Sequence, residues 1–98
     1  MEKLPHANGF RELLVYQKAR ELSKDIFKLT LSFPKDEAYS LTSQIRRSSR
    51  SIGANIAEAW AKRRYEAHFT SKLSDCDGEN SETDSSLDFA RNCGYLTD

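Results

Sequence analysis

Few side chains in this sequence have the types and spacing that catalysis requires. The chain contains two histidines, His6 and His68, and two cysteines, Cys76 and Cys93. A cysteine near a histidine becomes a nucleophile only where a third group orients the histidine, and the sequence offers no such group. We therefore expect no catalytic residues and no enzymatic activity, and we interpret Cys76 as a small core residue.

Metal and phosphate motifs are also missing from the sequence. The stretch 75–79, DCDGE, superficially resembles the start of a calcium loop. An EF-hand needs glycine at its sixth position and glutamate at its twelfth, and here these positions hold Asn80 and Ser86. No glycine-rich phosphate loop or zinc-ligand spacing is present. We expect a solvated acidic helix face and no metal or cofactor.

Basic residues are the chemistry-bearing side chains that do cluster. Residues 46–64 hold six basic residues and one acid, whereas 75–88 hold six acids and no base. Arginine suits phosphate groups, and a basic face is typical of nucleic-acid binding. The whole chain is nevertheless neutral, so three interpretations stay open: pairing with the acidic segment within or between protomers, RNA or DNA binding, and a solvated face. The candidate residues are Arg46, Arg47, Arg50, Lys62, Arg63 and Arg64.

The element that positions these residues is predicted to be a closely packed helix. Ile45, Ile52, Ile56 and Ala59 recur with the period of one helical face. Most of the remaining surface is nearly smooth because its side chains are small: Ser48, Ser49, Ser51, Gly53, Ala54, Ala57 and Ala61. A mid-helix glycine costs about 1 kcal/mol relative to alanine, which suggests close backbone approach or a bend at Gly53.

Two further helices are expected on either side of this one. An apolar stripe from Val15 to Phe33 predicts a helix over about 11–31, after an irregular lead-in at 1–9. The residue before a proline leaves the helical region, so Pro34 should end that helix and open the next, over about 35–62. A single helix from 35 to 90 would be about 80 Å long, which requires a turn near 62–66 and a third helix over about 66–92.

Length and composition place the chain in the all-α class as one domain, 1–98. No segment alternates like a strand, and no apolar run approaches the eighteen or so residues of a membrane span. The N-terminus lacks the apolar core of a signal peptide, and two cysteines make no disulfide framework. We therefore expect a cytoplasmic protein with no membrane association.

Long stretches of the chain resemble a known bacterial family. They are FRELLVYQKARELSKDIFKLT, FPKDEAYSLTSQIRRSSRSIGANIAEA and a third-helix frame ending in GYL. The chain is similar to the four helix bundle proteins, also called 23S rRNA-intervening sequence proteins, whose function is unknown. The motif positions that carry the resemblance are Gln44, Ile52, Asn55, Ile56, Glu58 and Glu82. If buried, Asn55 and Glu58 should belong to a polar network that fixes helix register.

The resemblance implies an antiparallel up-down helical bundle that assembles into a homo-oligomer, often a pentamer, without catalytic activity. The family usually continues past GYL into a fourth helix, whereas this sequence ends at Asp98. We therefore expect three long helices, with the fourth absent or reduced and a groove that a neighbouring protomer covers. The family also differs at Ala59, where it usually has glycine, and at Gly53, where many members have proline.

Two functions follow as expectations. The first is a non-enzymatic oligomeric scaffold or accessory protein that acts through protein–protein contacts. The second is an RNA- or DNA-binding module that uses the basic face of the second helix. The resemblance links both to ribosomal RNA insertions or to a reverse transcriptase, since the accessory variability protein of diversity-generating retroelements is similar and works as an oligomeric partner of such an enzyme.

Overall fold

The computed structural model describes residues 7–96, so His6, most of the expected lead-in and Asp98 lie outside it. Its elements are the α-helices α1 (Leu14–Thr30), α2 (Leu41–Ala61) and α3 (Glu66–Asn92) and the 3₁₀ helices η1 (Phe10–Glu12) and η2 (Lys35–Glu37). The described range contains no strand, which confirms the all-α class. None of the helices within 7–96 is long and apolar enough to span a bilayer.

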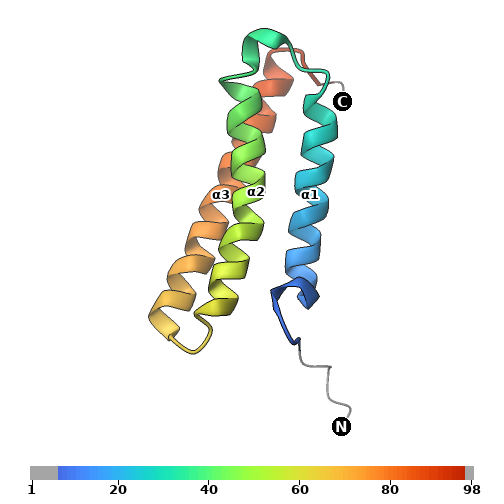
Figure 1. The fold of residues 1–98 in the computed structure, drawn as a ribbon. Coiled ribbons are helices and arrows are strands. Elements are labelled where there is room, and N and C mark those ends of the chain that lie inside the picture. Colours follow the sequence, from blue (N-terminus) through green and yellow to red (C-terminus); the bar gives the residue numbers. More distant parts are fainter. Residues whose placement is uncertain (1–6, 97–98) are drawn as a thin grey trace.

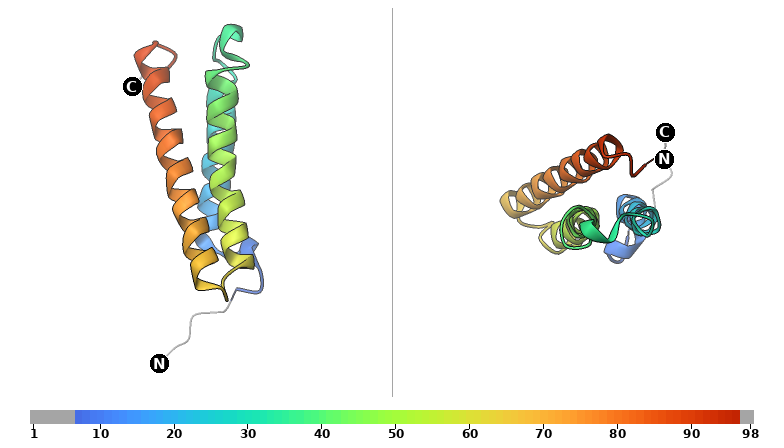
Figure 2. Two further views of the ribbon diagram at one scale, coloured as in Figure 1. Left: turned by 90° about the vertical axis from the view of Figure 1, so that its left-hand side faces the viewer. Right: turned by 90° about the horizontal axis from the view of Figure 1, so that it is seen from above.

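Helix α2 is the centre of the fold. In Figure 1, α1 runs upward, α2 runs back down beside it, and α3 runs upward again. Helices α1 and α3 each pack along α2, but their backbones do not contact each other. In the view from above in Figure 2, the α3 ribbon lies apart from the α1 ribbon.

The core stripe predicted for α2 is buried. Ile45, Ile52, Ile56 and Ala59 are all at most 6% exposed, because one face of α2 packs against two helices at once. Ala54, by contrast, is exposed and lines the outer surface, so the small residues are not all at close contacts. A Cβ added at Gly53 would lie 3.5 Å from Tyr16 Cε1, which is an ordinary contact with a side chain. The expected backbone approach at Gly53 is therefore wrong.

The stripe predicted for α1 is buried only in part. Ala19, Ile26 and Phe33 are buried, whereas Val15 is 57% exposed and Leu29 is 39% exposed. The physical reason is that α1 packs on a single helix, which covers a narrower strip than the sequence pattern provides. The α-helix also begins at Leu14 instead of about 11, because Leu13 has extended backbone angles between η1 and α1.

The second helix begins six residues later than the sequence indicated. Residues 35–37 form η2, and α2 starts only at Leu41. The Ser40 hydroxyl donates a hydrogen bond to the Glu37 carboxylate, 2.6 Å away, and the Ser40 backbone is far from helical. Local side-chain bonds of this kind compete with helix formation, which explains why Pro34 does not open α2 directly.

The contact between α2 and α3 is built from small polar side chains. Ser48 and Ser49 on α2 are at most 1% exposed, and Thr83 and Ser86 on α3 are at most 6% exposed. The Ser48 and Thr83 hydroxyls share a hydrogen bond of 2.8 Å. Because these groups are short, the two helices can approach closely while the oxygens of Ser48, Ser49 and Thr83 remain paired.

Helix α3 ends in a Schellman motif that closes one end of the fold. Gly94 has a φ of +79°, its N–H donates to Arg91 O, and the Tyr95 N–H donates to Ala90 O. This reversal carries the Tyr95 ring to Phe33, with ring centroids 5.6 Å apart. The Tyr95 hydroxyl also donates to Glu37 Oε2 at 2.9 Å, so the end of α3 is joined to the connection between α1 and α2.

Candidate functional site

Two surface features are candidates for function, and both are organised by α2. The first is the groove between α1 and α3, with a volume of about 350 Å³. Its floor is formed by Ile52 and Ile56 of α2, and its apolar walls include Val15 of α1 and Leu73 of α3. Val15 and Leu73 are 57% and 42% exposed. The groove therefore presents partly uncovered apolar surface.

Cys76 also lines this groove and is half-buried. Burial, together with the neighbouring Asp77 carboxylate, raises the pKa of the Cys76 thiol. The thiol therefore stays protonated at neutral pH, and a protonated thiol is a poor nucleophile. Cys76 was expected to be a small core residue, but it packs against the core from its edge and is only half-buried.

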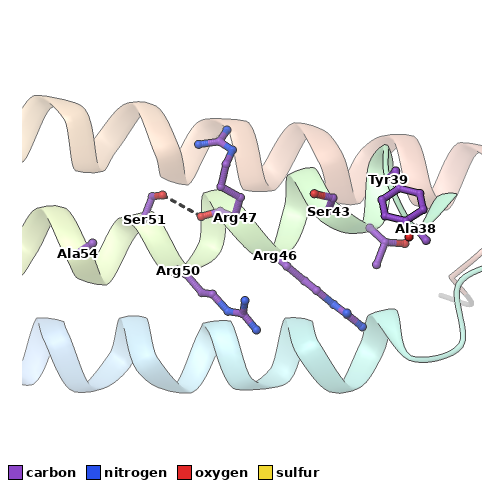
Figure 3. A pocket seen from close by; sticks show the side chains of 9 residues that line it. Ala38, Tyr39, Ser43, Arg46, Arg47, Arg50, Ser51 and Ala54 are labelled. Carbon is purple, nitrogen blue, oxygen red and sulfur yellow. Dashed lines mark hydrogen bonds between the residues drawn. The ribbon is translucent and has the colours of Figure 1, made fainter.

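The second feature, which we call the α2 trough, lies on the outward face of α2. It has a volume of about 540 Å³. Arg46, Arg47 and Arg50 all line it (Figure 3), together with the exposed Tyr39 at one end and Ala54 at the other. The structure therefore brings three of the six predicted basic residues into one site.

Arg47 is directed toward α3 (Figure 3) and pairs with its acids. Its Nη2 lies 2.6 Å from Glu82 Oε1, and its Nη1 lies 3.5 Å from Glu79 Oε1. The hydrogen bond and the charge of Glu82, followed by the charge of Glu79, raise the pKa of Arg47 further above its ordinary value. Pairing with the acidic segment thus occurs within one protomer at this position.

Arg46 and Arg50 are directed the other way, toward α1 (Figure 3). Arg46 Nε donates to Thr30 Oγ1 at 2.8 Å, and its guanidinium lies 4.7 Å from the centroid of the Phe27 ring. Arg50 is exposed and forms no hydrogen bond or ion pair with residues 7–96. Arg46 is therefore held in place by neutral groups and Arg50 by none, and neither guanidinium forms an ion pair with an acid among residues 7–96.

The other three predicted basic residues lie elsewhere. Lys62, Arg63 and Arg64 occupy the connection between α2 and α3, about 18 Å along the helix axis from Arg50 at 1.5 Å per residue. Arg63 folds back so that its guanidinium lies 4.2 Å from the centroid of the Trp60 ring and donates to Trp60 O. The structure thus separates the predicted basic cluster into two groups.

The remaining motif residues have structural environments. Ile52 and Ile56 are core residues, and Glu82 holds Arg47. Glu58 is exposed and accepts an ion pair from Lys72 Nζ at 2.9 Å, which raises the pKa of Lys72 and ties α2 to α3. The register-fixing network was expected only for a buried Glu58, and this ion pair lies on the surface. Gln44 is exposed. The Asn55 side chain is half-buried and forms no hydrogen bond with residues 7–96.

Sequence reasoning missed four residues of the α2 trough: Ala38, Tyr39, Thr42 and Ser43. Tyr39 is fully exposed, and Thr42 is only 8% exposed although its Oγ1 has no hydrogen-bond partner within the described range. A signal was present only for Ser43, since Ser43, Arg46, Arg50 and Ala54 follow each other along α2 at spacings of three and four. That spacing marks the helix face opposite the isoleucine stripe.

The chain matches a known protein family. A family model described as 23S rRNA-intervening sequence protein matches residues 11–98. No curated protein matches the chain.

Proposed function

Because the chain belongs to the 23S rRNA-intervening sequence protein family, we propose that it is a non-enzymatic helical scaffold that acts through protein–protein contacts. The family is not a known family of enzymes. The observation that carries the proposal is the open groove between α1 and α3. In an antiparallel up-down bundle, the fourth helix packs between the first and the third, so the groove lies where such a helix would bind.

We assign this position to a second copy of the chain. Helix α1 carries four basic and two acidic residues, whereas α3 carries seven acidic and two basic residues. A neighbouring copy that lays its α1 edge along α3 would bring basic residues to acidic ones and would cover Val15 and Leu73 together. Exposed ion pairs contribute about 0–1 kcal/mol each, so apolar burial supplies the affinity and charge sets the orientation.

Contacts of this kind are heterologous, because the edge that one copy offers differs from the edge that the next copy offers. They close into a ring when the rotation between copies permits. The resemblance implies five copies, and we adopt this number. We place the assembly in the cytoplasm, where both thiols stay reduced, and a reverse transcriptase or another protein partner would contact its outer surface.

The test compares two apolar residues of α3. Leu73→Asp puts a charge into the groove, whereas Phe89→Asp changes a residue that is 61% exposed and lies outside the groove. We expect Leu73→Asp to lower the mass measured by light scattering, because it desolvates a carboxylate at the interface. Phe89→Asp should leave the mass unchanged. An equal response of both variants would contradict the proposal.

A second candidate function is nucleic-acid binding by the outward face of α2. The observation in its favour is the α2 trough, in which Arg46 and Arg50 lean away from the acidic helix and keep donors available. The family takes its name from intervening sequences of 23S rRNA, which makes RNA the first nucleic acid to test. Steep weakening of binding at high salt would support phosphate contacts.

A further inference from the structure

On the basis of the second candidate function, we propose that the α2 trough binds a single strand of nucleic acid. Two phosphates would lie on Arg46 and Arg50, and one base would stack on Tyr39. The trough extends along α2 from Ser43 to Ala54, which is about 16 Å at 1.5 Å per residue. A long, open surface of this kind fits an extended chain better than a compact small molecule.

The two arginines form a pair suited to consecutive phosphates. They are one helical turn apart and both lean toward α1 (Figure 3). Thr30 and Phe27 hold the Arg46 side chain through its Nε and its guanidinium plane, which leaves the two terminal nitrogens to bind a ligand. Guanidinium groups bind phosphate oxygens in a bidentate manner, and a pre-positioned one loses less side-chain entropy on binding.

Tyr39 supplies an aromatic surface at the end of the same trough. Its ring is fully exposed and touches no other ring within the described residues. Bases of every kind stack on such rings in proteins that bind single strands. An acidic peptide offers carboxylates to the arginines but no flat base to Tyr39, so the aromatic ring favours a nucleic acid.

Thr42 is an independent sign of a missing ligand. The residue is 8% exposed and lines the trough, yet its Oγ1 has no hydrogen-bond partner among residues 7–96. Buried hydroxyls in folded proteins are nearly always paired. Because this oxygen is inaccessible to solvent, a phosphate or sugar oxygen in the trough would accept its hydrogen bond only after the Thr42 side chain rotates toward the trough.

The neighbouring acidic helix decides between a single strand and a duplex. Glu79 and Glu82 lie on the α3 side of the trough and already balance the charge of Arg47. The second strand of a duplex would approach α3, which carries seven acidic residues, and would be repelled. A single strand can instead follow the side of the trough that faces α1, where Arg46 and Arg50 are directed.

The experiment measures fluorescence anisotropy of a labelled oligouridylate of about ten nucleotides, a length within the usual site size. We expect the full-length chain to bind it with a slope of log affinity against log salt near −1.4, about 0.7 for each of two phosphates. Arg50→Ala should weaken binding and bring the slope to about −0.7. Arg20→Ala, which removes an exposed arginine of α1, is the matched control and should change neither the affinity nor the salt slope.

The aromatic contact is tested separately. Tyr39→Ala should weaken binding roughly tenfold, since stacking contributes about 1–3 kcal/mol for each base. Tyr39→Phe keeps the ring and should bind like the unmodified chain. Tyr39 and Arg50 are both exposed, so circular dichroism should show the same helix content in the variants at both positions as in the unmodified chain.

Four results would overturn the inference: no binding, equal affinity for a duplex of the same length, equal displacement by polyglutamate, or full affinity of Tyr39→Ala. Its failure is distinguishable from failure of the scaffold proposal. A monomeric protein that binds oligouridylate contradicts the scaffold and supports this inference. An oligomer that binds no oligouridylate supports the scaffold proposal and contradicts this inference.

Discussion

At the scale of single residues, the packing of α2 against α3 depends on paired hydroxyls. Ser48 and Thr83 are at most 2% exposed and share a hydrogen bond of 2.8 Å. The Thr83 hydroxyl donates its proton to Glu79 O at 2.9 Å, so the Ser48 hydroxyl is the donor to Thr83 Oγ1, and Ile45 O lies farther from Ser48 Oγ, at 3.3 Å. These bonds let short polar groups occupy a helix contact where the sequence pattern alone would favour apolar ones.

Thr83→Val tests this pair with a side chain of nearly the same shape. We expect a loss of about 1–2 kcal/mol in the free energy of unfolding, because the Ser48 hydroxyl loses its partner across the helices. Urea unfolding at fixed protein concentration measures the loss. Thr70→Val, on the exposed surface of the same helix, is the control and should change stability little. Equal stability of the two variants would contradict the role of the pair.

Replacement by alanine should have opposite effects on stability at Gly53 and at Gly94. Gly53→Ala should raise the melting temperature, since its Cβ would meet Tyr16 and Ala19 at ordinary distances of 3.5 and 3.8 Å and alanine favours a helix interior by about 1 kcal/mol. Gly94→Ala should lower it, because a φ of +79° costs a residue with a Cβ about 1–2 kcal/mol. Differential scanning calorimetry decides, and a shift of the same sign in both would refute the interpretation.

At the scale of elements, the end of α3 and the α1–α2 connection are held together by Tyr95. The Ser40 hydroxyl and then the Tyr95 hydroxyl lower the pKa of Glu37, and the bond to Glu37 raises the pKa of Tyr95 to about 12. The contribution of Glu37 is fully present above the ordinary pKa of glutamate, about 4.3, and is lost as pH falls through its lower folded value. The contribution of Tyr95 is lost as pH rises toward 12.

Tyr95→Phe should therefore flatten part of this pH dependence. It keeps a ring against Phe33 but removes the hydroxyl that bonds to Glu37. We expect the variant to be less stable than the unmodified chain at neutral pH, and we expect the difference to shrink as pH falls through the lowered pKa of Glu37 and its carboxylate becomes protonated. Melting temperatures recorded from acid to neutral pH measure this. Parallel curves for the two proteins would show that the bond does not contribute.

The elements were more predictable than their ends and their exposure. The apolar stripe of α2 has one strong helical period, and all four of its residues are buried: Ile45, Ile52, Ile56 and Ala59. The late start of α2 depends on a hydroxyl–carboxylate bond between Ser40 and Glu37, which no apolar period records. Val15 was expected in the core because a pattern shows which face is apolar, whereas its exposure depends on how many helices pack there.

For the candidate site, the sequence predicted which residues cluster but not which of them form ion pairs. Arginine at 46, 47 and 50 was visible as a cluster, but the sequence cannot show that Arg47 pairs with Glu79 and Glu82 while Arg46 and Arg50 form no ion pair among residues 7–96. That division depends on which side of α2 the acidic helix occupies. Tyr39 was missed because it precedes α2, and only the three-dimensional turn brings it to the end of the trough.

At the scale of the whole molecule, charge and apolar surface are both distributed asymmetrically. The basic helix α1 and the acidic helix α3 flank α2 without backbone contact between them, and the apolar groove lies between them. A copy of the chain thus offers two different edges that are complementary in charge. We attribute assembly to this groove and nucleic-acid binding to the opposite, outward side of α2, so that the two functions need not compete.

The most direct test of this account is the mass of the unmodified chain in solution, measured by light scattering over a dilution series. The account predicts a homo-oligomer, with five times the mass of one chain, that dissociates only on dilution. The mass of a single chain at tens of micromolar would contradict it, because the groove between α1 and α3 would then remain uncovered.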